Sequence, residues 1–114
     1  MYTKCEPIHC RGILPLQDTP SVKFSYFTAI TVNNKYAVNM SANYTGEENV
    51  EGSTNKIYRF HCQINIPSYL FALVVGNLKT VQIDNRTNVI AEPDVVDGYA
   101  KILSPLPTLL AATE

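Results

Sequence analysis

The alternation of side chains between Val22 and Val32 is the feature that most limits what this chain can form. Every second residue from Val22 is apolar, aromatic or β-branched, and most of the residues between them are smaller or more polar. A two-residue period places the two sets of side chains on opposite faces of an extended strand. We therefore predict a strand here, with one face directed toward a core and the other partly apolar.

Further segments with strand character follow at short intervals. The turn at Asn33-Asn34 predicts a hairpin between the first strand and a returning strand. The later strand segments are Tyr36–Tyr44, Lys56–Ile66, the continuously apolar run Tyr69–Val75, and the pair Leu78–Ile83 and Thr87–Ala91. The run Tyr69–Val75 is typical of a strand buried on both faces. Together these segments predict an all-β fold of curved, mostly antiparallel sheets with roughly six to eight strands.

The regular alternation ends after Glu92. Residues 93–114 contain Pro93, Pro105 and Pro107 and show no strand period. We therefore expect one β-domain over residues 1–92 and an irregular tail over residues 93–114, in which Leu109–Ala112 has the composition to start a short helix.

Charge and composition exclude several classes of partner. The net charge is -1 and the nine basic residues are scattered, whereas nucleic-acid and anionic-membrane binding need clustered bases. The run Tyr69–Val75 is the longest apolar stretch and falls far short of the roughly 20 residues that a spanning helix needs. Three cysteines do not make an even disulfide framework, and no apolar leader is visible. We therefore expect a cytoplasmic protein with reduced thiols, no nucleic-acid partner and no membrane.

The first twenty residues gather chemically reactive side chains. Cys5, His9 and Cys10 lie close in sequence, and His61-Cys62 stands apart. These five side chains are all possible zinc ligands, but the sequence lacks the C-x-x-C pair that is common in zinc sites. Free cysteine is among the most buried residue types, so we interpret the cysteines as core residues and expect no metal or other cofactor in this chain.

Two opposite charges flank the same stretch. Arg11 and Asp18 are separated by Pro15 and a short apolar segment. Charge-assisted hydrogen bonds between a guanidinium and a carboxylate are among the stronger ones in proteins. We predict that this pair holds the amino-terminal loop in place, with two separate surface charges as the alternative.

Two segments resemble a known family. Cys5–Arg11 followed by Pro15–Lys23 is similar to the C-(Q/E)-A-x-x-x-R and P-x-x-D-x-P-x-x-K stretch of the zinc aminopeptidases related to leukotriene A4 hydrolase. Ile66–Gly76 resembles the I-P-x-Y-L-I-A-L-V-V-G strand of the same family. The resemblance implies the saddle-like amino-terminal β-domain that precedes the catalytic domain in these enzymes.

The resemblance also implies a binding role for Glu6. In the family, the Glu or Gln that follows the cysteine of the opening motif lies in the subsite for the amino terminus of the substrate. Glu6 occupies that position here, and Lys4 and Cys5 would contribute neighbouring surface. Lys4 replaces a glutamine that is usual in the family, and its cation would partly repel a substrate amine.

The family's catalytic motifs are not in this sequence. Its zinc is held by an H-E-x-x-H helix, and a G-x-M-E-N segment binds the substrate amine, but neither motif occurs among these 114 residues. Leu106–Ala111 resembles the stretch that opens the catalytic domain. We therefore expect a fragment of a zinc metalloaminopeptidase, inactive alone, whose partners are the missing catalytic domain and, in the complete enzyme, a peptide amino terminus.

A second class of function stays open. The chain would then be a stand-alone β-sheet interaction module with no peptidase role. Phe27, Ala29 and Ile57 fall on the second faces of their strands, where an uncovered apolar surface favours association. We accordingly expect self-association as a further interaction.

Overall fold

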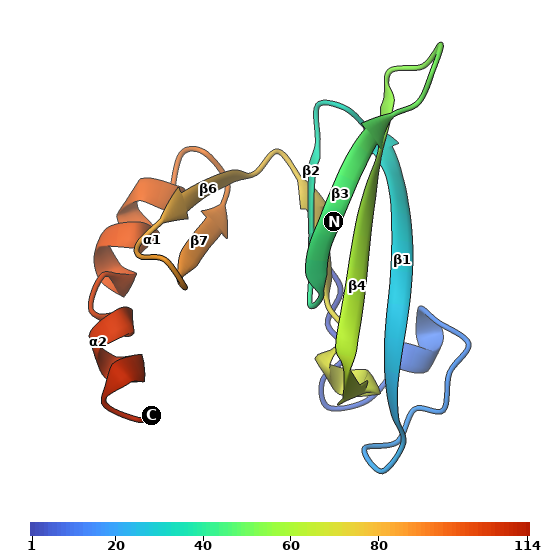
Figure 1. Ribbon diagram of the computed structural model, residues 1–114, viewed down its shortest axis with the longest axis horizontal. Helices are drawn as coiled ribbons and strands as arrows, with labels where there is room; N and C mark the ends of the chain where they lie inside the picture. Colours follow the sequence, from blue (N-terminus) through green and yellow to red (C-terminus); the bar gives the residue numbers. More distant parts are fainter. The chain divides into compact units, whose positions relative to one another are not determined.

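The computed structural model describes all residues, Met1–Glu114, and the chain divides into two compact units, Met1–Val75 and Gly76–Glu114. Each unit is described by itself. The all-β class with antiparallel sheets is confirmed, and Figure 1 shows the strands of both units. Neither helix of the chain has the length and apolar character needed to cross a membrane.

The first unit is built on a three-stranded antiparallel sheet. Its order is β1-β4-β3, with β1 at Lys23–Asn33, β4 at Asn55–Pro67 and β3 at Asn43–Asn49. Burial alternates along β1, so that Phe24, Tyr26 and the even positions that follow are partly buried while Phe27 and the other odd positions up to Thr31 are exposed. The two-residue period predicted from Val22 to Val32 is confirmed.

A bulge interrupts the pairing of β1 with β4. Phe24 pairs with Ile66 but Tyr26 pairs with Cys62, so three residues of β4 face one residue of β1. The extra residues displace Ile64, which is 76% exposed although it continues the apolar alternation of Tyr58, Phe60 and Cys62. A bulge of this kind bends the strand and ends the regular ladder near the amino-terminal loop.

The predicted hairpin between the first strand and Tyr36–Tyr44 is wrong. The returning segment divides into β2, Ala37–Met40, which pairs with β5, Leu73–Gly76, and β3, which pairs with β4. The change of partner falls at Ser41, whose backbone N–H donates to the Ala72 carbonyl at 3.0 Å and whose hydroxyl accepts from the Ala72 N–H at 2.8 Å. These bonds hold the returning segment to the residue just before β5, so that it does not pair with β1 as a simple hairpin would.

The prediction that the apolar run Tyr69–Val75 is a single strand buried on both faces is wrong. A short 3₁₀ turn, η2 at Ser68–Leu70, precedes the strand, and β5 is half-buried along its length. On its other side β5 meets the start of the chain, where Tyr2 bridges Val74 in antiparallel fashion and the Thr3 N–H donates to the Leu73 carbonyl at 2.9 Å. The chain's first residues are therefore held beside β5 by an isolated antiparallel bridge.

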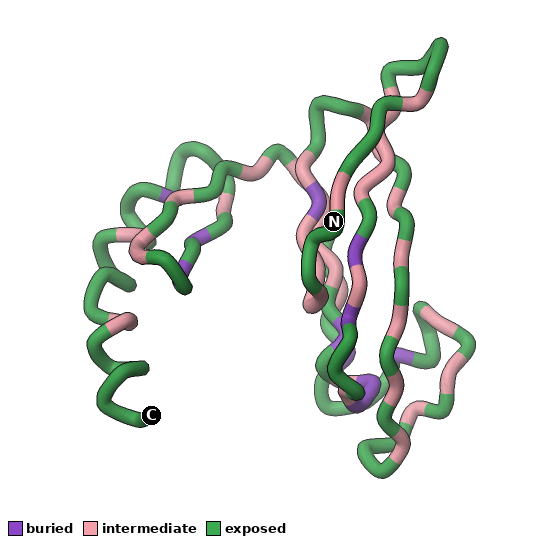
Figure 2. The backbone as a smooth tube through the Cα atoms, in the orientation of Figure 1, coloured by how far each residue is buried: buried purple, intermediate pink, exposed green.

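A small core lies beneath the first sheet. Cys5, Cys10 and Phe71 are buried together, and the half-buried side chains of Leu14, Leu16, Tyr26, Met40 and Leu73 pack against them. The rings of Tyr26 and Phe71 lie 5.4 Å apart at their centroids. Figure 2 shows that buried positions are few along the tube. The amino-terminal loop, with a short turn η1 at Cys10–Gly12, thus supplies much of the material that covers the sheet.

The second unit pairs a hairpin with helices. Strands β6, Lys79–Gln82, and β7, Asn88–Ala91, are antiparallel, and α1, Val96–Leu103, contacts both. A second helix, α2, covers Leu106–Ala111. The short helix expected at Leu109–Ala112 is present as α2, whereas α1 was not expected, so the tail is more regular than predicted. Pro105 and Pro107 lie at the cap and in the first turn of α2, where a missing N–H costs no helical hydrogen bond.

Candidate functional site

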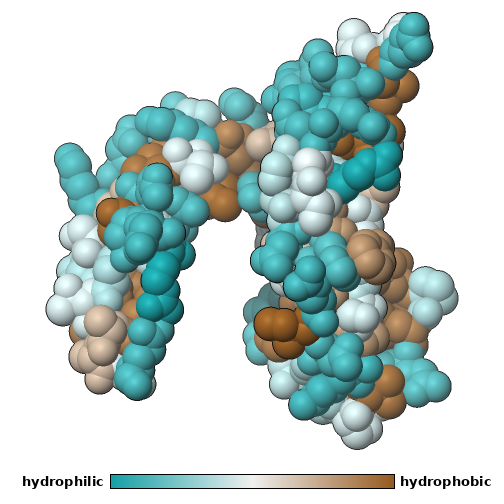
Figure 3. Space-filling model, in the orientation of Figure 1, coloured by the Kyte–Doolittle hydropathy of each residue, from teal (hydrophilic) through white to brown (hydrophobic).

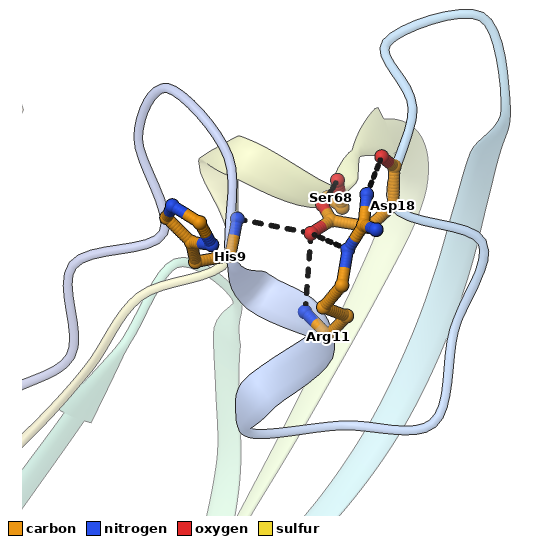
Figure 4. Close-up of polar contacts among 4 residues, drawn as sticks. All are labelled: His9, Arg11, Asp18 and Ser68. Atoms are coloured by element: carbon orange, nitrogen blue, oxygen red, sulfur yellow. Dashed lines mark hydrogen bonds and ion pairs between the residues drawn. The ribbon is translucent and has the colours of Figure 1, made fainter.

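The carboxylate of Asp18 is the most highly bonded polar group in the amino-terminal loop. Its Oδ2 accepts from the backbone N–H of His9 at 3.0 Å and of Arg11 at 3.2 Å. Its Oδ1 accepts from the hydroxyl of Ser68 at 2.6 Å. Figure 4 shows the three donors converging on this side chain, which is only 3% exposed. The carboxylate therefore joins the loop to the end of β4.

The predicted pairing of Arg11 with Asp18 is confirmed. The Arg11 Nε donates to Oδ2 at 3.1 Å, and the Arg11 Nη2 donates to the Asp18 backbone carbonyl at 3.2 Å. Two donors from one guanidinium fix both the side chain and the backbone of Asp18. The alternative of two separate surface charges is excluded by these contacts.

Ser68 was missed by the sequence analysis as a member of this site. The sequence shows only a Pro67-Ser68 break at the end of a strand, 50 residues from Asp18. The side chain is 2% exposed, and a buried hydroxyl needs a partner. No local pattern around Ser68 identifies this bond, because its acceptor is a side chain 50 residues away.

The hydrogen bonds set the charge state of this site. The Ser68 hydroxyl is the largest cause that lowers the pKa of Asp18 far below its ordinary value of 3.8, and the donors of Arg11 and His9 lower it further. Burial opposes them by penalising the charged form. Asp18 is therefore an anion over the whole physiological pH range, and its role is to hold the loop.

The Asp18 bonds fix the loop around two buried thiols. His9 adopts a left-handed backbone with φ 96°, and the next residue, Cys10, is fully buried at 0% exposure. Burial, followed by the hydrogen bond with the Cys5 thiol, raises the pKa of Cys10 to about 12. A thiol with so high a pKa is a core group and a poor nucleophile.

The predicted substrate-binding residues, Lys4, Cys5 and Glu6, lie between two points at which hydrogen bonds fix the chain. Before them, the Leu73 N–H donates to the Thr3 hydroxyl at 2.9 Å, and after them comes the Asp18 site. Cys5 is 3% exposed and points into the core, whereas Lys4 and Glu6 are exposed on either side of it. The structure thus displays Lys4 and Glu6 to solvent on a segment fixed at both ends.

No metal centre is formed by these residues. The structure contains no group of three or more His, Cys, Asp or Glu side chains arranged to hold a metal ion. His61 instead stacks on Phe27, with ring centroids 3.7 Å apart and planes 13° apart, and all three cysteines are free and buried. The donor set of this chain does not fit a zinc ion, so no zinc chemistry is assigned to it.

The comparison with known proteins defines the class. The Peptidase M1 N-terminal domain model matches residues 1–70, which is more than half of the chain. The chain therefore belongs to the Peptidase M1 N-terminal domain family. This confirms the resemblance found in the two sequence segments.

Particular relatives agree with this assignment. The chain is 42% identical over 98 residues to leukotriene A-4 hydrolase of Xenopus laevis, covering 85% of this chain and 16% of that protein. It is 36% identical over 94 residues to leucine aminopeptidase 2 of Neurospora crassa, covering 82% of this chain and 14% of that protein. The chain thus spans about a sixth of the length of these curated relatives.

Solved structures show the same fold. Yeast LTA4 hydrolase in complex with bestatin matches with a TM-score of 0.75 at 29% identity, over 90% of this chain and 15% of that one. An M1 zinc metallopeptidase from Deinococcus radiodurans matches with a TM-score of 0.69 at 26% identity, over 92% of this chain and 27% of that one. Zinc thus occurs in this family, and no group of side chains in this chain is arranged to hold a metal ion.

Proposed function

We propose that this chain serves as the non-catalytic amino-terminal domain of a leukotriene A4 hydrolase-like zinc metalloaminopeptidase. In this role it packs on the catalytic domain and forms part of the subsite for the amino terminus of the substrate. The observation that supports the proposal most is the exposure of Lys4 and Glu6, which belong to the matched family region and lie between the Thr3–Leu73 hydrogen bond and the Asp18 site. Residues 1–92 form the domain in this proposal, and residues 93–114 form the lead-in to the catalytic domain.

Glu6 has the central role in the proposed subsite. A carboxylate accepts hydrogen bonds from a protonated α-amine at short range and offsets its charge. Glu6 has no hydrogen-bond or ion-pair partner within the chain, so its oxygens are available to a substrate. Lys4 forms neighbouring surface and weakens the attraction, while buried Cys5 fixes the segment from below.

The reactive metal belongs to the catalytic domain in this proposal. The donor groups of the chain do not assemble around a metal, so its residues bind and orient and take no part in bond cleavage. We also propose a cytoplasmic location for the parent protein, because the three cysteines remain as free thiols.

A first experiment separates this proposal from independent catalysis. The purified chain is incubated with zinc and an aminoacyl chromogenic amide, with and without a chelator. The proposal expects no chelator-sensitive turnover. Turnover that the chelator abolishes would contradict it.

A second experiment tests the domain role directly. The region of Xenopus laevis leukotriene A-4 hydrolase that aligns with this chain's β-domain is replaced by residues 1–91 of the chain. The graft is expected to fold and to retain aminopeptidase activity, because the two regions are 42% identical over 98 residues. A matched graft carrying Asp18→Asn should lose stability and activity together, whereas one carrying the exposed-loop change Glu51→Gln should not.

A stand-alone interaction module is the second candidate function. The observation that favours it is the exposed outer face of the first sheet, where Phe27 is 77% exposed. The graft distinguishes the two, since a module unrelated to catalysis would not support activity in place of the native domain.

A further inference from the structure

The outer edge of β1 presents backbone groups without partners. β1 ends the sheet β1-β4-β3, so only one of its sides is paired. The Asn34 N–H donates to the Thr54 carbonyl at 2.8 Å, which shows that even-numbered residues direct their N–H and C=O groups toward β4. The odd-numbered residues Phe27, Ala29 and Thr31 therefore direct theirs outward, and no hydrogen bond within the chain uses them.

Beyond the bulge between Phe24 and Tyr26, this edge has none of the usual protections against strand pairing. β1 is 11 residues long, KFSYFTAITVN, with no proline and one charged residue, Lys23, at its end. Edge strands of natural proteins are usually short, charged, bulged or covered, because an open edge is a template for another strand. Its aromatic and β-branched composition is that of a paired, central strand.

The edge complements a second copy of itself. We propose that two chains associate through antiparallel pairing of β1 with β1, about a two-fold axis at Thr28. This register places Phe27 opposite Ala29 of the other copy, Ser25 opposite Thr31, and Lys23 opposite Asn33. The outward groups of Phe27 and Ala29 then donate and accept reciprocally, as in any hydrogen-bonded antiparallel pair.

The charge of the strand and the length of the paired register favour a second copy of the chain as the partner of this edge. The only charge on the strand, Lys23, meets the neutral Asn33, so the two-fold register brings no like charges together. Registers centred on Phe27 or Ala29 leave two residues of each strand unpaired, whereas the register centred on Thr28 pairs all 11 residues. The product is a continuous six-stranded sheet, β3-β4-β1-β1-β4-β3.

The outer face gains apolar contact in the same arrangement. Phe27 is 77% exposed and stacks on His61 within its own chain. In the dimer its ring lies against the methyl group of Ala29 of the other copy, and the two Phe27 rings become diagonal neighbours. Figure 3 shows apolar side chains reaching the surface along the side of this unit where β1 runs.

Two matched double variants test the register. In F27K/A29E the proposed pairing places the introduced lysine opposite the introduced glutamate of the other copy, and in F27E/A29E it places two glutamates opposite each other. Both variants lose the same apolar groups, and both place a glutamate beside Arg59, the neighbour of Ala29 on β4. The two variants differ only at residue 27, which lies beside His61 in its own chain and which the proposed register places opposite residue 29 of the other copy. Sedimentation of the full chain at high salt, which reduces the effect of net charge, should show at least about tenfold weaker association for F27E/A29E.

Sedimentation of the unchanged chain comes first and should show a monomer–dimer equilibrium. Ala29→Pro is expected to give a monomer, because it removes an outward N–H and leaves the bonds to β4 intact. Circular dichroism of each variant confirms that the fold is retained. Hydrogen exchange at high concentration should slow at the amides of Phe27, Ala29 and Thr31 but not at Glu47 and Asn49 on the opposite edge.

Four results would overturn the proposal: an unchanged chain that stays monomeric at every concentration, species larger than dimers in place of a dimer, equal association of the two double variants, or exchange protection absent from the outer edge of β1.

Discussion

Removal of the Ser68 hydroxyl should destabilise the first unit and change how its stability depends on pH. Ser68 is 2% exposed, and its hydroxyl donates to the Asp18 carboxylate at 2.6 Å. Ser68→Ala deletes one oxygen, so the cavity it leaves is small and the lost hydrogen bond dominates. A hydrogen bond to a charged group contributes roughly 1.5–3 kcal/mol, and we expect a loss of about 2 kcal/mol in the free energy of unfolding.

Urea and thermal unfolding of the full chain, followed by circular dichroism, measure this effect. A loss of about 2 kcal/mol lowers the midpoint temperature by roughly 10 °C in a unit of this size. The control is Ser25→Ala, measured at a concentration where the chain is monomeric, because Ser25 is exposed on β1 and makes no side-chain hydrogen bond within the chain. That control should change the free energy of unfolding by less than about 0.5 kcal/mol.

The pH dependence gives a second readout with a defined sign. The folded state lowers the pKa of Asp18 below its ordinary value of 3.8, so the ionised carboxylate stabilises the fold. That contribution is complete above about pH 5 and is lost as pH falls below 3.8 toward the lower folded pKa. The difference between Ser68→Ala and the unchanged protein should therefore be full at pH 7 and should begin to shrink below pH 3.8, with part of it remaining at pH 2 because the folded pKa of Asp18 lies far below its ordinary value.

Two results would refute this reasoning. One is a Ser68→Ala protein as stable as the Ser25→Ala control at pH 7. The other is a difference that stays the same between pH 7 and pH 2, because it would show that the Asp18 charge is not what Ser68 stabilises.

Two further predictions concern thiols and glycines. Ellman's reagent should leave the three buried cysteines unreacted in the native chain and react with all of them in denaturant, since burial raises the pKa of Cys10 to about 12; rapid reaction of the native chain at neutral pH would contradict the buried core. Gly46→Ala should lower the free energy of unfolding by at least about 1 kcal/mol, because Gly46 has φ 147° at the β3 bulge. Gly98→Ala in α1 should raise it by roughly 0.5–1 kcal/mol, because the added methyl group meets no atom there. Chemical denaturation measures both changes, and changes of the same sign would contradict the argument.

The strands could be predicted because their patterns are local. The period of β1 depends only on which face each residue occupies, and the structure keeps it from Phe24 to Thr31. The strand partners could not be predicted in the same way. In place of the hairpin expected from Asn33-Asn34, β1 pairs with β4 and the returning segment is bonded at Ser41 to Ala72; both contacts join segments far apart in the sequence.

The site shows the same division between local and distant information. Arg11 and Asp18 were identified from their charges and closeness in the sequence, but their third partner, Ser68, lies 50 residues away. A buried hydroxyl cannot be recognised without knowing what covers it. In the last twenty residues, a short helix was expected at Leu109–Ala112 and is present as α2, whereas α1 was missed because the prolines around it suggested irregular chain. Prolines at the cap and in the first turn are compatible with α2.

The most direct test of the proposed function is the effect of Glu6 on the Michaelis constant of the grafted enzyme. Glu6→Ala and Glu6→Gln are compared with the exposed control Glu51→Gln, using peptides that carry a free or an acetylated amino terminus. For free peptides, Glu6→Ala should raise KM roughly tenfold or more, with a smaller rise for Glu6→Gln and none for the control. The same KM for all three grafts would show that Glu6 does not hold the substrate's amine and would contradict the proposed subsite.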